Sequence, residues 1–159
     1  MSNGEKRTYN TGINYTMTEI ELIARAVIKQ GDRILLAHMI GETNTFLPGG
    51  HIEPGEYVEE ALLRELHEEL GVEAEIGDFV GLVEHKFTDD NDGKRHEEID
   101  LIFTALIKES EVSSAEGHLE FLWVKPDDFN KMTLLPSSFQ WLIKNWLEDG
   151  RIFHYAEKC

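Results

Sequence analysis

The segment from Glu56 to Leu70 constrains this chain more than any other stretch, because it lacks glycine and proline and is rich in Glu, Leu, Ala and Arg. That composition favours an α-helix, and Gly71 stands where helices commonly end. At about 100° of rotation per residue, Glu65 and Glu69 fall about 40° apart, in the same sector as Leu62. Two carboxylates are therefore predicted to lie beside side chains that face the core.

Three glutamates on this segment raise an electrostatic problem. Glu65 stands three residues before Glu68 and four before Glu69, and like charges at these spacings cost about 0.2–0.5 kcal/mol per exposed pair. The cost rises when the groups are partly buried, unless one takes up a proton. Arg64 is expected to pair with Glu60 or Glu68 and to point away from the other two carboxylates. A bound Mg²⁺ would remove the repulsion; on geometry alone, a metal site and a solvated charged face remain equal alternatives.

Most of the remaining elements are predicted to be strands. Residues 19–30 and 33–39 form a hairpin that turns at Gly31-Asp32. Residues 43–55, with two prolines and three glycines, are predicted to be a loop. The other expected elements are one or two strands at 72–88, a turn at 89–98, strands at 99–107 and 118–124, a short helical turn at 126–132, and a helix at 137–150 capped by Ser137 or Ser138 and stopped by Gly150.

Composition limits the class of protein and its partners. The 159 residues suggest one domain, which we place at 18–159 after a loose polar leader at 1–17, with a mixed sheet between helices in an α/β fold. The chain has no run long and apolar enough for a membrane span, and its one cysteine, Cys159, predicts a reducing cytoplasmic location. A net charge of −16 argues against nucleic acid or an anionic membrane as the main partner. A small phosphorylated ligand stays compatible if cations lie between it and the carboxylates.

The stretch from Gly50 to Val72 matches a known pattern at every specified position. It reads Gly50, five residues, Glu56, seven residues, Arg64-Glu65-Leu66, one residue, Glu68-Glu69, one residue, Gly71-Val72. This resembles the Nudix box, G-x5-E-x7-R-E-U-x-E-E-x-G-U, in which U is aliphatic. Nine constrained positions at fixed spacing argue against chance. The order of the flanking strands is also similar over residues 18–148, so the resemblance implies the Nudix α/β/α sandwich.

The resemblance implies roles for the residues of the box. The predicted catalytic residues are Glu56, Arg64, Glu65 and Glu69. The predicted metal ligands are the Gly50 carbonyl, Glu65, Glu68, Glu69 and Glu116. Glu65 is either a ligand or the group that orients or deprotonates the attacking water, whereas Arg64 holds the carboxylates in place. Glu116 is the first candidate for the acidic ligand that the family often adds from a later loop; the alternatives are Glu97, Glu98 and Glu120.

Substrate-binding residues are less constrained by the pattern. His51 follows the glycine pair and Phe46 and Phe87 lie near the box or the strands beside it, so these three are the candidates for contact with substrate. His96 and His118 flank predicted strands, where a plain hydrogen-bonded role is the better interpretation. The proline and tyrosine markers of ADP-ribose and dinucleoside polyphosphate hydrolases are absent at 86–90. Their absence leaves a nucleoside di- or triphosphate as the broadest expectation.

The expected activity follows from the resemblance. Nudix enzymes hydrolyse a diphosphate linked to another moiety, and we expect Mg²⁺, or alternatively Mn²⁺, to assist attack by water on a nucleoside diphosphate derivative, with a (d)NTP as first choice. The alternatives are an ADP-ribose or dinucleoside polyphosphate hydrolase, a non-catalytic module that senses nucleotides, and, last, an isomerase on the same scaffold. The expected partner is a small-molecule nucleotide, and a homodimer stays open.

Overall fold

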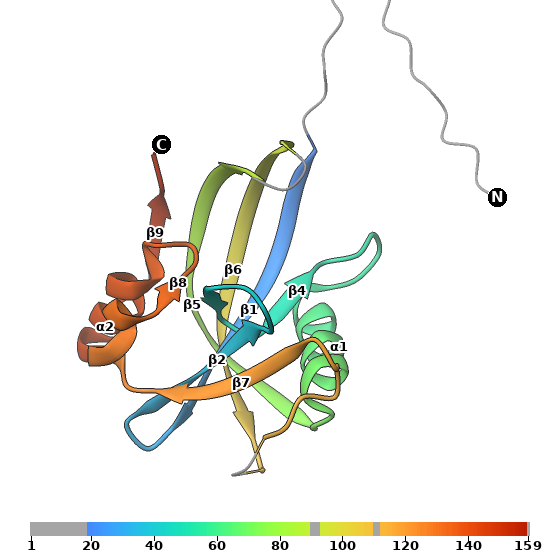
Figure 1. Ribbon diagram of the computed structural model, residues 1–159, viewed down its shortest axis with the longest axis vertical. Helices are drawn as coiled ribbons and strands as arrows, with labels where there is room; N and C mark the ends of the chain where they lie inside the picture. The colour runs from blue at the N-terminus through green and yellow to red at the C-terminus, as the bar shows by residue number, and fades with distance from the viewer. Residues whose placement is uncertain (1–18, 90–92, 110–111, 159) are drawn as a thin grey trace, which may run out of the picture.

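The computed structural model describes residues 19–89, 93–109 and 112–158 (Figure 1). The predicted leader at 1–17 and the tip of the predicted turn at 89–98 lie outside these residues. The described part of the chain forms two α-helices, one 3₁₀ helix and nine strands. Their bounds are β1 (Ile20–Gln30), β2 (Arg33–Met39), β3 (Asn44–Phe46), β4 (Gly49–His51), α1 (Val58–Leu70), β5 (Ala74–Thr88), β6 (Arg95–Ile107), β7 (Leu119–Val124), η1 (Pro126–Lys131), β8 (Thr133–Leu134), α2 (Phe139–Asp149) and β9 (Phe153–Ala156).

The strands form one mixed sheet in the order β8-β3-β2-β1-β6-β5-β9, with β4 paired to β1 and β7 paired to β2. β1 runs antiparallel to β2 and β4 but parallel to β6, with Glu21 opposite Glu98. β5 and β6 are the long antiparallel pair beside β1 (Figure 1). The predicted hairpin between β1 and β2 is confirmed, and Gly31 at its turn has φ of 60°, which a glycine adopts without strain.

The two helices cover opposite faces of this sheet (Figure 1). Alternate side chains of a strand point to opposite faces. On β1, Val27 packs into a core with Phe139 and Ile143 of α2, whereas Ala26 packs into a second core with Leu62 of α1. The predicted α/β/α sandwich is therefore confirmed. No helix within the described residues is long and apolar enough to cross a membrane.

The prediction of a loop at 43–55 is wrong in part, because this segment contains β3 and β4. Glycine here permits strand pairing that a side chain would block. Gly49 has φ of +129°, and a Cβ atom on it would lie 2.0 Å from the Ala24 carbonyl oxygen of β1. The close approach lets Gly49 and Gly50 pair with Arg25 and Ala24 of β1. The glycine and proline content of this segment therefore predicted a loop at a place where β4 pairs with β1.

Three boundaries also differ from the sequence expectation. The first helix begins at Val58 rather than at Glu56, although Gly71 ends it as predicted with φ of 66°. Of the one or two strands predicted at 72–88, the structure has one, at 74–88, with register shifts near its glycines. β6 starts at Arg95, inside the predicted turn. Ser138 precedes α2 but makes no capping hydrogen bond with its side chain, because both serines bind the carboxylate of Glu157 instead.

Candidate functional site

The predicted box residues meet where α1 packs beside β4. Leu62 and Leu66 anchor α1 in the core and are fully buried. Their position turns Glu69 inward, so that only 6% of this residue is exposed and its Oε2 accepts a hydrogen bond of 3.0 Å from the Gly49 N–H. The helical sector predicted for Glu69 is therefore the sector that the structure has.

The carboxyl of Glu69 is the most perturbed acid of this region. Burial raises its pKa to about 7, although the Gly49 hydrogen bond and the positive charge of Arg25 oppose the rise. The charges of Glu65 and Glu116 raise the pKa further. Negative charge thus accumulates around Glu69 from both an adjacent turn of α1 and the segment before β7, as a cation site requires.

Glu65 lies directly against the backbone of β4. A Cβ atom on Gly50 would sit 2.5 Å from the Glu65 carboxyl carbon, so only glycine leaves room for this carboxylate. Arg64 Nη1 donates to Glu65 Oε1 at 2.7 Å and to Glu68 Oε2 at 3.3 Å. The expectation that Arg64 points away from Glu65 is wrong, because its long side chain folds back along the helix to reach both acids.

Arg64 also ties the helix to the preceding loop. It donates to both oxygens of Glu56, at 2.7 and 2.9 Å, and to the His51 carbonyl at 3.0 Å. The hydrogen bond from Arg64, helped by the Glu53 backbone N–H, lowers the pKa of Glu56 to about 2. Such a two-pronged guanidinium–carboxylate contact fixes orientation as well as charge. Glu60, the other partner expected for Arg64, instead accepts from the Tyr57 N–H at the start of the helix.

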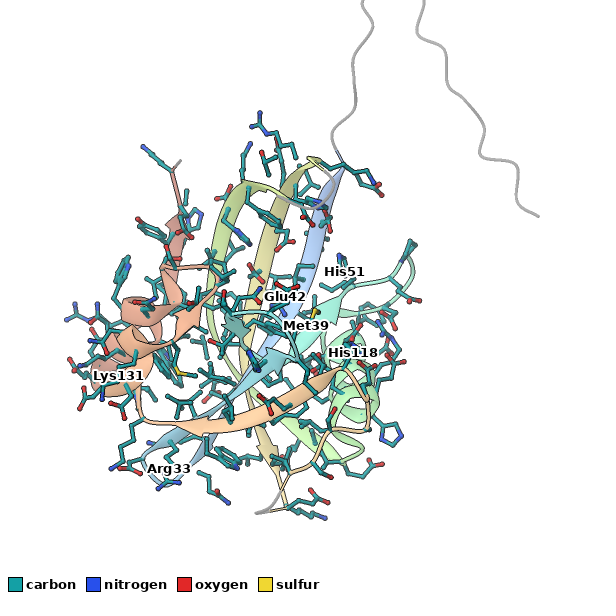
Figure 2. All side chains as sticks on the ribbon, in the orientation of Figure 1. Arg33, Met39, Glu42, His51, His118 and Lys131 are labelled. Carbon is teal, nitrogen blue, oxygen red and sulfur yellow. The ribbon has the colours of Figure 1, made fainter. Side chains whose placement is uncertain are left out.

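Glu116 lies beside the box. The Ala115 N–H donates to the Glu69 carbonyl at 2.8 Å, which holds the segment against α1, and His118 Nε2 lies 3.2 Å from Glu116 Oε2. Figure 2 shows His118 on the α1 side of the molecule. The alternatives bind elsewhere: Glu97 with Lys86, Glu98 with His85, and Glu120 with His38.

The residues present fit a magnesium ion by their chemistry. Mg²⁺ takes oxygen ligands only, usually one or two carboxylates completed by water and phosphate. Glu65, Glu68, Glu69 and Glu116 all offer carboxylate oxygens, and Gly50 forms a cradle that a Cβ atom would fill. Among the described residues, the triads of ligand atoms that lie within 4.8 Å of one another do not include these glutamates. In this conformation Arg64 Nη1 bridges Glu65 and Glu68, and the Gly49 N–H binds Glu69.

A cavity of about 440 Å³ opens on the face of the sheet that α2 covers. Phe46 and Phe87 line it, together with Arg25. Arg25 Nη1 donates to the Leu47 and Gly49 carbonyls at 3.2 and 3.3 Å, so Gly49 contacts Arg25 through its carbonyl and Glu69 through its N–H. The cavity and the box therefore share the Gly49 backbone.

The third predicted substrate contact, His51, lies apart from this cavity. Its Nε2 is 2.7 Å from Glu21 Oε2, and its side chain is largely exposed on the α1 side in Figure 2. Glu21 also lies 2.6 Å from Nδ1 of His96. The hydrogen bond with His51, and to a smaller extent that with His96, lowers the pKa of Glu21.

Sequence reasoning missed a row of polar side chains on the α2 face, which we call the polar stripe. It carries acids, imidazoles and one guanidinium where a sheet interior is normally apolar. Its members are Glu21, Arg25, His85, His96, Glu98 and Asp100. The signal was present in the two-residue period of His96, Glu98 and Asp100. It was hidden because His96 and Glu98 were assigned to a turn.

Comparisons with known proteins agree with this arrangement. A family model described as NUDIX domain matches residues 21–144. The nucleoside triphosphatase NudI of Escherichia coli O1:K1 is 35% identical over an alignment that covers 64% of this chain and 79% of that protein. The crystal structure of a MutT protein from Bacillus halodurans matches with a TM-score of 0.65 at 26% identity, covering 86% of this chain and 90% of that chain. A MutT protein from Methanosarcina mazei Go1 matches with a TM-score of 0.68 at 23% identity, over 84% and 97% of the two chains.

Proposed function

Because this chain belongs to the Nudix family and is a Nudix pyrophosphohydrolase, we propose that its substrate is a nucleoside triphosphate and that its metal is Mg²⁺. One observation carries the proposal. Glu65 and Glu69 project from one side of α1 onto the Gly49-Gly50 backbone, and Arg25, which donates to the Gly49 carbonyl, lines a cavity large enough for a nucleoside. A diphosphate bridging the two would place its phosphates at the carboxylates and its base in the cavity.

The carboxylates and Arg64 carry the chemistry. When bound at Glu65, Glu68, Glu69, Glu116 and the Gly50 carbonyl, Mg²⁺ supplies positive charge to the phosphate oxygens and lowers the pKa of the attacking water. Glu65 orients that water, and its own position is set by Arg64 on one side and the Gly50 backbone on the other. Glu56 fixes Arg64 in turn. The chain thus supplies positioning, which is the main protein contribution to phosphoryl transfer.

The cavity supports the choice of a nucleoside. Phe46 and Phe87 line its wall, where their rings give a nucleoside base an aromatic surface to pack against. Phe87 is itself held between the rings of His85 and His96, at centroid distances of 5.4 and 5.0 Å. Its orientation is thereby fixed before a ligand arrives. The relative named as a nucleoside triphosphatase supports the same substrate class.

The direct test is product analysis with a panel of substrates and Mg²⁺ or Mn²⁺. We expect nucleoside triphosphates to release pyrophosphate or phosphate faster than ADP-ribose is cleaved to AMP and ribose 5-phosphate, and faster than dinucleoside polyphosphates are cleaved to nucleotides. Preference for ADP-ribose would overturn the substrate assignment but not the hydrolase. Binding without turnover of any compound would favour the nucleotide-sensing module.

Phe87→Ala tests the cavity separately. Removal of the Phe87 ring from the cavity wall should raise the KM for a nucleoside triphosphate about tenfold. It should leave kcat within about threefold of the wild-type value, because the Phe87 ring is remote from the phosphates. Trp141→Ala is the matched control, since Trp141 is exposed to a similar extent, 45% against 40%, on α2. An unchanged KM in Phe87→Ala, with both variants folded, would place the nucleoside elsewhere.

A further inference from the structure

The polar stripe contains a triad of ligand atoms that the proposed hydrolysis does not use. We call His85, Glu98 and Asp100 the inner triad; its three ligand atoms lie within 4.8 Å of one another. An outer triad of Glu21, His96 and Glu98 shares one member with it. His85 faces Glu98 across the antiparallel β5–β6 pair, and Asp100 is the next residue on the same face of β6. Rigid neighbouring strands therefore hold the inner triad.

One imidazole nitrogen in the inner triad faces two carboxylates. His85 Nε2 lies 2.9 Å from Glu98 Oε2 and 3.1 Å from Asp100 Oδ2. Its single N–H can point at only one acceptor, and it donates to Glu98. Asp100 is fully buried, and its Oδ2 receives no hydrogen bond from any atom of the described residues. A buried carboxylate oxygen left without a donor is costly, and a cation in place of the proton would contact all three atoms at once.

We propose that the inner triad binds a divalent transition-metal ion of the zinc class. With bonds of about 2.0–2.1 Å, the two nitrogen–oxygen separations of 2.9 and 3.1 Å subtend about 90–100° at the ion, somewhat less than the tetrahedral angle. A nitrogen donor beside two carboxylates favours Zn²⁺ and similar ions over Mg²⁺, which takes oxygen. Binding releases the His85 proton, so two negative charges and one positive guanidinium then surround the ion.

The surroundings are those of a built metal site. Arg25 Nε donates to the other oxygen of Asp100 at 3.0 Å and so turns Oδ2 toward His85. The Phe87 ring stacks on the His85 ring at an interplanar angle of 13°, which fixes the plane of the imidazole. Oriented partners behind the ligands are typical of metal sites. His85 and Glu98 also line cavities of about 440 and 400 Å³, which give an ion access from solvent.

The site is separate from the box. The box glutamates come from α1 on one face of the sheet, whereas the inner triad lies on the face that α2 covers. Its donors include nitrogen, whereas the box donors are oxygen. An ion at the inner triad would lie at the wall of the proposed nucleoside cavity. Because the inner triad and the box have no ligand residue in common, substitutions can empty one site and leave the other intact.

Co²⁺ is a suitable probe because its visible absorption is weak for the six-coordinate aqua ion and becomes much stronger in a protein site of lower coordination number. The full-length chain carrying Glu65→Gln, Glu68→Gln and Glu69→Gln, in saturating Mg²⁺, should still bind one equivalent of Co²⁺ with visible absorption. Adding His85→Gln or Glu98→Gln should weaken that binding at least about tenfold. Glu120→Gln is the matched control, because Glu120 pairs with His38 outside the stripe and its loss should change nothing.

His96→Gln separates the two triads. The proposal requires Co²⁺ affinity to stay within about threefold of the parent protein in this variant, because His96 is not a ligand of the inner triad. Loss that follows His96 but not His85 would overturn the inner triad, and loss of all Co²⁺ with the box glutamates would overturn a second site altogether. Should the stripe variants unfold, anomalous diffraction from a Co²⁺-soaked crystal of the unmodified chain decides: a peak between His85, Glu98 and Asp100 supports the site, and its absence there overturns it.

Discussion

Two groups of carboxylates, the box on α1 and the polar stripe on β1, β5 and β6, solve the same electrostatic problem differently. In the box, four acids lie near one another, and Arg64 is the cation that touches three of the predicted site acids. In the stripe, Glu21, Glu98 and Asp100 each meet an imidazole, and Arg25 adds a guanidinium. The side chains of the box therefore carry a net negative charge, whereas the positive and negative side chains of the stripe nearly cancel one another.

The difference appears in how each group holds protons. Burial raises the pKa of Glu69 to about 7, so folding favours the protonated form of this carboxyl over its charged form. Burial alone would lower the pKa of His85, but the carboxylates of Asp100 and Glu98, 3.1 and 2.9 Å from its Nε2, outweigh burial and raise it to about 9. In the metal-free chain, the acids around Glu69 therefore oppose its ionisation, whereas the carboxylates of the stripe are paired with a protonated imidazole.

The largest expected effect is that of Glu69→Gln. This change keeps the acceptor for the Gly49 N–H but removes a charge from the box, so we expect kcat for a nucleoside triphosphate to fall about 10³-fold, the scale of losing a charge-stabilising group in a transition state. Steady-state kinetics in Mg²⁺ measures it. The thermal unfolding temperature of the metal-free variant should be no lower than that of the wild type, because the substitution removes a repulsive charge. Glu59→Gln, on an exposed position of the same helix, is the control; equal activity of the two variants would contradict the assignment of the box.

Arg64→Lys should have an intermediate effect. Lysine keeps the charge but cannot make the forked contacts with Glu56 and Glu65, so these carboxylates lose their fixed positions. We expect kcat to drop about 10- to 100-fold, as when residues that orient metal ligands are changed. The Mg²⁺ concentration for half-maximal rate should rise in parallel. Full activity in Arg64→Lys would contradict the proposed role of Arg64 in positioning the box carboxylates.

The smallest effect concerns the stripe, in metal-free protein kept in chelator. The pKa of His85 in the folded chain is about 9, above the value of 6.5 for a free imidazole, so its contribution to stability is full below about pH 6.5 and is lost as pH rises through about 9. His85→Gln should therefore lower the free energy of unfolding by about 2 kcal/mol at pH 6 and by much less at pH 10. Urea titrations at pH 6 and pH 10 measure the difference in unfolding free energy between the wild type and His85→Gln. His67→Gln, at an exposed position of α1, is the control. A gap that widens with pH would contradict the paired state of His85.

The parts of this molecule that follow from local pattern could be predicted from its sequence. The uninterrupted segment before Gly71 became α1, the Gly31-Asp32 turn joined a hairpin, and the helical sector of Glu69 was the buried one. Membership of the Nudix family and the sandwich fold, which followed from the spacing within the box, are confirmed. Each of these features depends on residues within a few turns of one another.

The parts that failed depend on distant contacts. β4 exists because Gly49 can approach Ala24 of β1, which the glycine content of the segment concealed. The side chain of Arg64 was placed by helical angle alone, and its reach back to Glu65 needed the fold. The polar stripe joins residues of three strands, and the local pattern of His96, Glu98 and Asp100 showed only its part on β6. The cytoplasmic location, the homodimer and the roles of the site residues stay predictions.

The central claim is that the acids of α1 exist to hold a divalent cation against a phosphate chain. Titration of Mn²⁺ into the chain, with bound metal followed by electron paramagnetic resonance in the presence and absence of a non-hydrolysable nucleoside triphosphate, tests it most directly. We predict tight Mn²⁺ uptake that strengthens with the nucleotide and is lost in a Glu65→Gln, Glu69→Gln double variant. Uptake that is the same in the double variant, or that ignores the nucleotide, would contradict the claim.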